Sequence, residues 1–246
     1  MATQRNTTES RGEFVTDAEL GGSYTTANVG GQNVRQSMIK VSLEGTSDQV
    51  REYYNEISGF YDEYCESVGK ECGAQNMAKI VESVQPSKNA RILDVACGNG
   101  ILGEQLKTLG YMNVDGLDFA QKMIDLTKSK GVFTNYICAS IDPDKKTPVP
   151  DNAYDVVCMN GSMGVGLVSP KCLPELTRMA KPGGVVIFNI TAYWVKTVAD
   201  FGDEAMAANL RALVRDGLWT KWIREEHVYY KTTGEKAVGY IGTVAR

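Results

Sequence analysis

Histidine is nearly missing from this 246-residue chain, since His227 is the only one. The six cysteines include no C-x-x-C pair, so we expect no zinc site and no other bound metal. Apolar runs are short as well, and residues 183–190, among the longest, fall far below the length that crosses a bilayer. The chain does not open with a basic segment followed by an apolar one, so we expect no secretory signal.

Basic residues are not in excess, because 26 Lys and Arg stand against 30 Asp and Glu for a formal net charge of −4. A chain of this charge has no long-range attraction to polyanions, so we expect neither a nucleic-acid nor a membrane partner. Cys97, Cys138 and Cys158 fall within or at the ends of predicted buried strands. That placement favours reduced thiols over disulfides and predicts a cytoplasmic location.

The first part of the chain divides into two segments. Residues 1–45 are rich in Thr, Ser, Asn, Gln and Gly and show no sustained period, which predicts a flexible tail or a flap that orders over a bound ligand. Residues 46–88 are predicted to form a helical cap. Apolar and tyrosine residues recur there at helical spacing between Val50 and Tyr64, and a second helix is expected at 74–84.

From residue 89 onward, strands alternate with glycine turns and helices. This alternation predicts an α/β fold of the doubly wound, Rossmann-like kind, with a mostly parallel sheet and helices on both faces. The last two strands are separated only by a short turn, so the final strand is expected to be antiparallel in a sheet of seven. The expected strands are 92–95, 114–117, 132–139, 154–159, 185–190, 220–230 and 237–244, and the expected helices are 100–109, 120–130, 173–180 and 203–216.

A glycine-rich loop follows the first of these strands. Gly98 to Gly103 matches G-x-G-x-x-G, and Asp118 lies 20 residues after Gly98 at the end of the next strand. These two facts are compatible with a dinucleotide-binding fingerprint. Asp94, inside the strand, points to a ligand with an ammonium group instead, because a pyrophosphate would be repelled by a buried carboxylate. No Tyr-x-x-x-Lys motif for hydride transfer follows.

The ordered set LDVACGNG (93–100), GLDFAQKM (116–123), PDNAYDVV (150–157) and KPGG (181–184) resembles the class I, seven-stranded S-adenosylmethionine-dependent methyltransferases. The resemblance runs from about Val50 to the C-terminus and makes 46–246 a methyltransferase domain, with a Rossmann-like core at 89–246. Residues 173–176 and the segment from Asp216 onward are most similar to the Williams–Beuren-region methyltransferase-like proteins.

The resemblance implies S-adenosylmethionine as the cofactor and S-adenosylhomocysteine as the product. Asp94 would meet the methionine ammonium, Asp118 the ribose hydroxyls, and Asn160 and Gly161 the methyl-bearing sulfonium. Ala96 stands where many members have glycine, and the segment 139–141 lacks the aspartate expected near the adenine. The full set of implied cofactor-binding residues is Asp94, Ala96, Gly98, Gly100, Asp118, Phe119, Met123, Ser140, Ile141, Asn160, Gly161, Tyr54 and Tyr61.

The function expected from this resemblance is methyl transfer to a small-molecule acceptor through a nitrogen or oxygen nucleophile. An amine needs no strong base, whereas an alcohol or phenol does, and His227, Tyr193 and Glu225 are the candidate bases. A non-catalytic S-adenosylmethionine-binding regulatory protein and a dinucleotide-dependent oxidoreductase remain as alternatives. The sequence leaves open the acceptor, its nucleophilic atom and the oligomeric state.

Overall fold

The computed structural model describes residues 28–29 and 32–246. The predicted flexible tail or flap therefore lies largely outside the described residues. The described part of that segment holds two short antiparallel strands, β1 (Asn28–Val29) and β2 (Gln32–Asn33), and an 11-residue helix, α1 (Val34–Glu44). We did not predict α1. Its apolar residues form a weak stripe, and packing against its neighbours stabilises it, as is usual for so short a helix.

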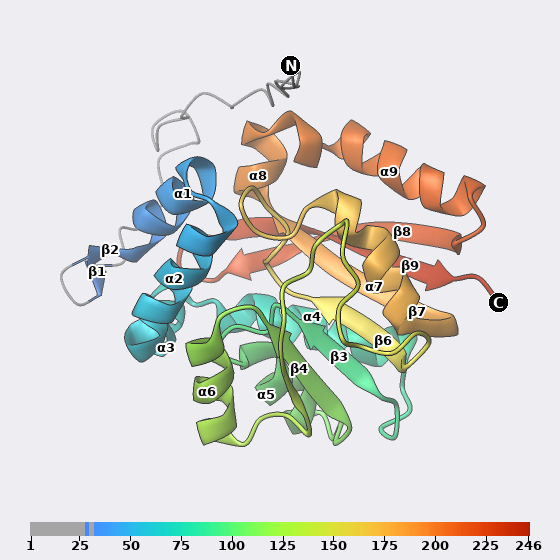
Figure 1. Ribbon diagram of the computed structural model, residues 1–246, viewed down its shortest axis with the longest axis horizontal. Helices are drawn as coiled ribbons and strands as arrows, with labels where there is room; N and C mark the ends of the chain where they lie inside the picture. The colour runs from blue at the N-terminus through green and yellow to red at the C-terminus, as the bar shows by residue number, and fades with distance from the viewer. Residues whose placement is uncertain (1–27, 30–31) are drawn as a thin grey trace, which may run out of the picture.

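A seven-stranded sheet forms the centre of the molecule (Figure 1). Its order is β5-β4-β3-β6-β7-β9-β8, and β9 is the one strand that runs antiparallel to both of its neighbours. The predicted doubly wound, mostly parallel sheet with an antiparallel last strand is thus confirmed. The strands are β3 (Ile92–Val95), β4 (Val114–Asp118), β5 (Tyr136–Cys138), β6 (Tyr154–Met159), β7 (Ala180–Thr191), β8 (Trp219–Tyr230) and β9 (Glu235–Val244).

The chain changes direction across the sheet between β3 and β6. It moves outward from β3 through β4 to β5, then returns to place β6 on the other side of β3. In open α/β sheets this reversal leaves a crevice beyond the carboxyl ends of the two strands, and ligands bind there.

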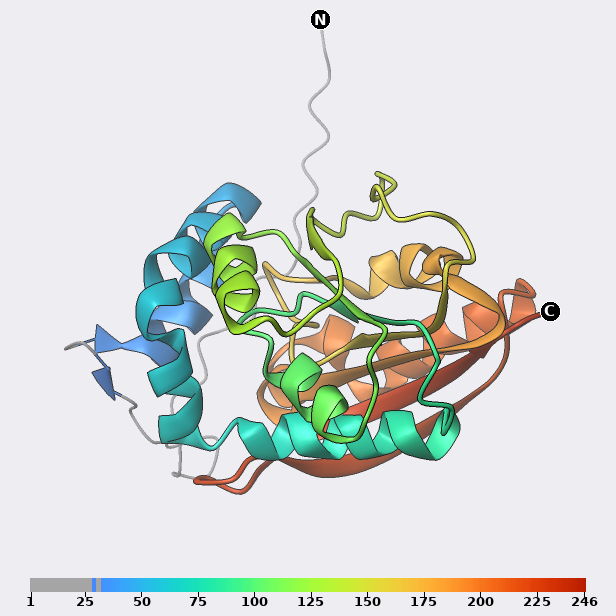
Figure 2. The same ribbon diagram turned by 90° about the horizontal axis from the view of Figure 1, so that it is seen from below.

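Helices cover both faces of the sheet, as Figure 2 shows for α4 along one face. The residues of α4 and α5 pack with Ile92, Val156 and Ile187 in one hydrophobic cluster, and α7, α8 and α9 pack on the opposite face. Among the described residues, no helix combines the length and the apolarity needed to span a membrane. The helices that follow the N-terminal segment are α4 (Glu71–Val84), α5 (Ile101–Thr108), α6 (Gln121–Lys130), α7 (Leu173–Met179), α8 (Ala192–Thr197) and α9 (Asp203–Arg215), with single 3-10 turns at Pro170–Cys172 and Ala199–Phe201.

The N-terminal helices form a separate layer at the carboxyl ends of β3 and β4. This layer consists of α1, α2 (Ser47–Ile57), a 3-10 turn at Ser58–Phe60 and α3 (Tyr61–Val68). Thr46 caps α2 in a reciprocal capping box with Gln49. A third apolar cluster, rich in tyrosine, joins these helices to α6 and to the end of β8. Helices occupy the predicted segment 46–88, but only α2 and α3 lie over the crevice; the second predicted helix, at 74–84, is part of α4 and packs on a face of the sheet.

One predicted strand is shorter than expected. We expected 132–139, but β5 covers only Tyr136–Cys138. The Phe133 ring occupies the space that side chains on Gly103 and Gly116 would need, and a Cβ at either glycine would overlap it. The apolar residues before β5 therefore fill the space between helix and sheet and do not extend the sheet.

Candidate functional site

A cavity of about 200 Å³ opens at the carboxyl ends of β3, β4 and β6. The helices α1, α2 and α3, the loop after β6 and the start of α8 close it. Eleven of the thirteen predicted cofactor-binding residues line it, together with the predicted base Tyr193. The eleven are Tyr54, Tyr61, Asp94, Ala96, Gly98, Asp118, Phe119, Ser140, Ile141, Asn160 and Gly161.

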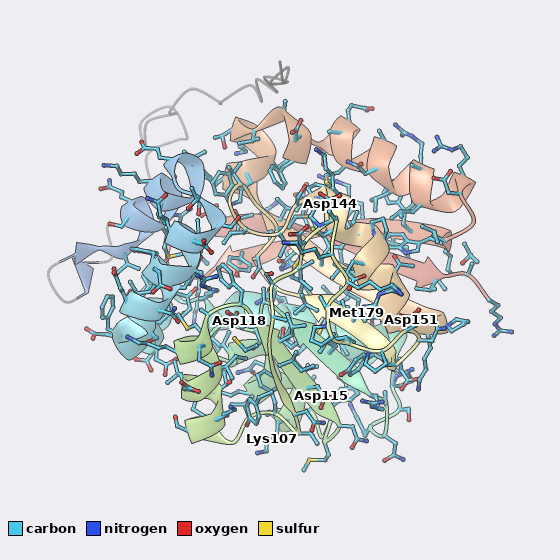
Figure 3. All side chains as sticks on the ribbon, in the orientation of Figure 1. Lys107, Asp115, Asp118, Asp144, Asp151 and Met179 are labelled. Carbon is cyan, nitrogen blue, oxygen red and sulfur yellow. The ribbon has the colours of Figure 1, made fainter. Side chains whose placement is uncertain are left out.

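Asp118 lies at the carboxyl end of β4 and faces the helical layer (Figure 3). Its Oδ2 accepts a hydrogen bond from the backbone N–H of Gly98 at 2.9 Å, and its Oδ1 accepts one from the N–H of Ala120 at 2.8 Å. Burial raises the pKa of this carboxyl to about 6, against the opposing effect of these backbone donors. Asp118 therefore holds the glycine loop against the end of β4.

The glycine loop turns through left-handed backbone conformations. Ala96 has a φ of 53° and Gly98 a φ of 52°, and a non-glycine residue at such an angle is uncommon. A Cβ on Gly98 would have only the ring of Tyr61 within 4 Å, at 3.8 Å, so the backbone at Gly98 faces open space in the cavity. This is the arrangement that a ligand contacting the main chain requires.

Gly100 and Met123 do not line the cavity. Gly100 caps α5 with a φ of 81°, and a Cβ there would lie 3.0 Å from the side chain of Thr127 and 3.3 Å from that of Val132. Met123 is buried in the tyrosine-rich cluster beneath α2 and α3. The structure thus places both residues in positions that support the loop and the helix, away from the ligand space.

An acidic side chain, Asp94, and a basic side chain, Lys70, line the same cavity without forming an ion pair with each other. Asp94 is 1% exposed, and its Oδ2 has no hydrogen-bond partner among the described residues. Burial raises its pKa well above the ordinary value; Asp118 adds to this rise and Lys70 opposes it. The ammonium of Lys70 donates to the hydroxyl of Tyr61 at 2.9 Å, and Lys70 forms no ion pair within the part of the chain that the structure describes.

Lys70 was not predicted as a site residue. It follows Gly69, which ends α3 with a φ of 64°, and precedes α4. Burial by itself lowers the pKa of Lys70, but the nearby oxygens of Tyr229 and Tyr61 raise it above its ordinary value, so the ammonium is retained. No sequence pattern marks a lysine between two helices as a site residue, and only the fold brings it to the cavity.

Aromatic side chains form the wall next to Asp118. The ring of Tyr54 lies 6.0 Å from that of Phe119 and 6.1 Å from that of Tyr61, measured between centroids. The loop after β5 contributes Ser140 and Ile141, as predicted, and Asp142. Asp142 thus places an acidic residue in the cavity wall one position after the segment 139–141, and its Oδ1 accepts the backbone N–H of Asp144 at 2.9 Å.

The opposite end of the cavity is formed by Asn160 and Gly161, α1 and the start of α8. The four lining residues from α1 are Arg35, Met38, Ile39 and Ser42. The guanidinium of Arg35 pairs with Glu235 at 2.6 Å, which fastens α1 to the start of β9. Tyr193 lines this end and is 7% exposed. His227 does not line the cavity; its Nε2 lies 3.2 Å from Nδ2 of Asn189, behind the loop after β6.

Comparison with known proteins supports the same interpretation. Residues 93–188 match a family model described as a methyltransferase domain. This match and the seven-stranded sheet fit a class I methyltransferase domain, as the sequence motifs predicted.

Relatives of this methyltransferase domain differ in their named activities. The chain is 29% identical over 134 residues to human methyltransferase-like protein 27, covering 54% of this chain and 53% of that protein. It is 27% identical over 157 residues to a ubiquinone/menaquinone biosynthesis C-methyltransferase of Geotalea daltonii, covering 61% and 65%. It is 33% identical over 104 residues to a malonyl-[acyl-carrier protein] O-methyltransferase of Serratia marcescens, covering 42% and 38%. The chain thus spans about half the length of these curated relatives.

Solved structures share the fold of the methyltransferase domain. A putative S-adenosylmethionine-dependent methyltransferase of Methanococcus maripaludis superposes with a TM-score of 0.56 at 14% identity, covering 78% of this chain and 94% of that one. The [4+2]-cyclase SpnF superposes with a TM-score of 0.58 at 17% identity, covering 82% and 97%. At these identities the likeness establishes the fold alone.

Proposed function

We propose that this protein binds S-adenosylmethionine and transfers its methyl group to a small-molecule acceptor, leaving S-adenosylhomocysteine. The observation that carries the proposal is that Asp94 and Lys70, an acidic and a basic side chain without an ion-pair partner among the described residues, line one cavity beside the glycine loop. Ionising a carboxyl as buried as that of Asp94 is costly unless a cationic ligand group pairs with it. The α-amino acid end of the cofactor carries an ammonium for Asp94 and a carboxylate for Lys70.

The remaining lining residues fit the other parts of the same molecule. Asp118, which lines the cavity at the end of β4, would accept hydrogen bonds from the ribose hydroxyls, and the open backbone at Gly98 allows close approach. Tyr54 and Phe119 supply aromatic faces for the adenine. When bound, the cofactor supplies an activated methyl group on a sulfonium, so the protein's part is to orient the reactants and exclude water.

The acceptor is proposed to bind between α1, α8 and the Asn160–Gly161 loop. Met38, Ile39 and Trp194 make this end of the cavity largely apolar, which suits an acceptor with an apolar or aromatic body. Relatives named for quinone and malonyl-carrier methylation agree with a small or carrier-linked acceptor. Tyr193 is the proposed base if the nucleophile is a hydroxyl, because His227 lies outside the cavity.

The test is calorimetric titration with S-adenosylmethionine, S-adenosylhomocysteine, decarboxylated S-adenosylmethionine and NADH. We expect the first two to bind, NADH not to bind, and the decarboxylated compound to bind at least about tenfold more weakly, because one charge-assisted contact contributes about 1.5–3 kcal/mol.

Substitution of Lys70 gives the matched control. Lys70→Met should bind the intact and the decarboxylated cofactor with equal affinity, whereas Lys70→Arg should keep the preference for the intact cofactor.

Binding of NADH alone would return the glycine loop to the dinucleotide interpretation. Tight cofactor binding without turnover across a broad acceptor screen would favour the non-catalytic regulatory alternative.

A further inference from the structure

Asn189 connects the cavity wall to a residue on the edge strand. It lies on β7, is fully buried and does not itself line the cavity. Its Oδ1 accepts the backbone N–H of Gly161 at 2.5 Å, and its Nδ2 donates to Oδ1 of Asn160 at 2.8 Å. The same Nδ2 lies 3.2 Å from Nε2 of His227.

These contacts form a row of hydrogen-bonding groups that runs from Asn160 and Gly161 through Asn189 to His227, and they assign every donor and acceptor in it. Because an N–H group of Gly161 can only donate, the atom of Asn189 that faces it must be the oxygen. The amide nitrogen of Asn189 then has two protons and two neighbours, Oδ1 of Asn160 and Nε2 of His227. Nε2 must therefore be an unprotonated acceptor, and the proton of the neutral ring lies on Nδ1.

The register of the sheet allows this row to cross a whole strand. Asn189 pairs with Gly239 on β9, and Gly239 pairs with Glu225 on β8. His227 reaches over Gly239, and a Cβ at this position would lie in van der Waals contact with the imidazole, 3.4 Å from its Cε1. The glycine therefore leaves room for the two polar side chains to meet across β9.

We propose that His227 is a positioning residue: through Asn189 it holds Asn160 and Gly161 in place at the methyl-transfer end of the cavity. The consequence for binding rests on the proposed function, whereas the hydrogen-bonding pattern itself does not. A protonated imidazole would present a donor to the donor group of Asn189, so the row would break and the loop after β6 would lose its support.

The surroundings of His227 keep the imidazole neutral. Burial lowers its pKa, and no charged neighbour contributes to this shift. On β8, Glu225 lies two residues before His227 and so faces the same side of the sheet. Helix α4 packs on this side, and its residues Asn76 and Cys72 donate to the backbone carbonyl of Val228, next to His227. The Nδ1 of His227 has no partner among the described residues.

The first experiment reads the ring directly in the protein without cofactor. Because the chain has a single histidine, its long-range ¹H–¹⁵N spectrum contains one imidazole. We expect a neutral ring with the proton on Nδ1 and an unprotonated Nε2 at pH 7. A ring protonated on Nε2 would overturn the proposal, whether or not the protein binds S-adenosylmethionine.

The second experiment compares His227→Gln with His227→Leu. A glutamine amide oxygen can accept from Asn189 where Nε2 did, and a leucine cannot. We expect His227→Leu to weaken S-adenosylhomocysteine about fivefold, the usual effect of one neutral hydrogen bond, and His227→Gln to stay within about twofold of the parent. Thermal unfolding confirms that both variants fold.

The pH profile separates positioning from mere packing. Protonation of Asp118 and Asp94 lowers the affinity of both proteins at acidic pH, so the difference between the profiles of the parent and of His227→Gln isolates His227. Affinity of the parent for S-adenosylhomocysteine should fall more steeply than that of His227→Gln as the pH drops through the pKa of His227. Equal affinities of parent, glutamine and leucine variants, or identical pH profiles of the parent and the glutamine variant, would refute the role of His227. Failure of all three proteins to bind would refute the proposed function and leave the spectroscopic result standing.

Discussion

The pKa of Asp118 leads to a prediction about how pH couples to cofactor binding. The carboxyl is 4% exposed, and burial raises its pKa to about 6. Ribose hydroxyls would donate hydrogen bonds to the ionised form, so bound cofactor favours the carboxylate and competes with the proton. Affinity for S-adenosylhomocysteine should therefore decrease as the pH falls through 6.

The magnitude follows from the ionised fraction. With a pKa of about 6, roughly nine-tenths of the Asp118 carboxyls are ionised at pH 7 and roughly one-tenth at pH 5, so this group can lower affinity by up to about ninefold over this interval. The full loss, about ninefold, is reached if the protonated form does not bind. Protonation of Asp94, whose pKa burial also raises, adds to the loss.

Stability of the ligand-free protein should change in the opposite direction. The folded pKa of Asp118 lies above the ordinary value of 3.8, so its contribution to stability is full below about pH 4 and is lost as the pH rises through 6. Lowering the pH from 7 to 5 should therefore increase the free energy of unfolding by about 1 kcal/mol through this group alone.

The assay compares the parent with Asp118→Asn by calorimetry and by thermal unfolding at both pH values. The variant should bind at least about tenfold more weakly at pH 7, since a charge-assisted contact is lost. Its pH dependence should be flatter in both measurements, and the difference from the parent isolates Asp118 from Asp94 and His227. Equal pH slopes for the two proteins would refute the ribose role and the raised pKa together.

Two further predictions concern packing around the cavity. Gly161→Ala should destabilise the fold by more than about 2 kcal/mol, because φ is +71° and the new Cβ would overlap the hydroxyl of Tyr229. The matched control Gly131→Ala, with a φ of +61° and open space, should cost about 1 kcal/mol in the same urea titration. Similar losses for both would contradict the close contact. Glu235→Gln should cost about 3 kcal/mol, because it removes the carboxylate that pairs with the buried guanidinium of Arg35. The double variant Arg35→Met/Glu235→Gln should recover much of that loss, and no recovery would show that the ion pair is not its source.

Local sequence patterns were sufficient to predict the architecture. The strand at Ile92–Val95 and the strand at Tyr154–Met159 were predicted with their observed bounds. Short apolar runs, glycine turns and helical periods depend on residues close together in the chain, so they can be recognised without tertiary contacts. The spacing between Gly98 and Asp118 can likewise be recognised in the sequence alone, and in the structure the N–H of Gly98 donates a hydrogen bond to Asp118.

The composition of the cavity was decided by the tertiary structure. Lys70 and helix α1 carry no local signal for a binding role, and they reach the cavity because α3 and α1 pack over the ends of β3 and β4. Gly100 and Met123 match the motif yet face away, since a motif specifies spacing along the chain and not the direction of each side chain.

For His227 the sequence indicated a role in the site that the tertiary structure does not support. Its chemistry made it one of three candidate bases, but the register of β7, β9 and β8 places it against Asn189 and outside the cavity. Sequence by itself determined the doubly wound fold, the glycine loop and the acidic residue at the end of β4. Only the packing of distant segments determined which charges meet in the cavity, because those contacts join residues that no local pattern relates.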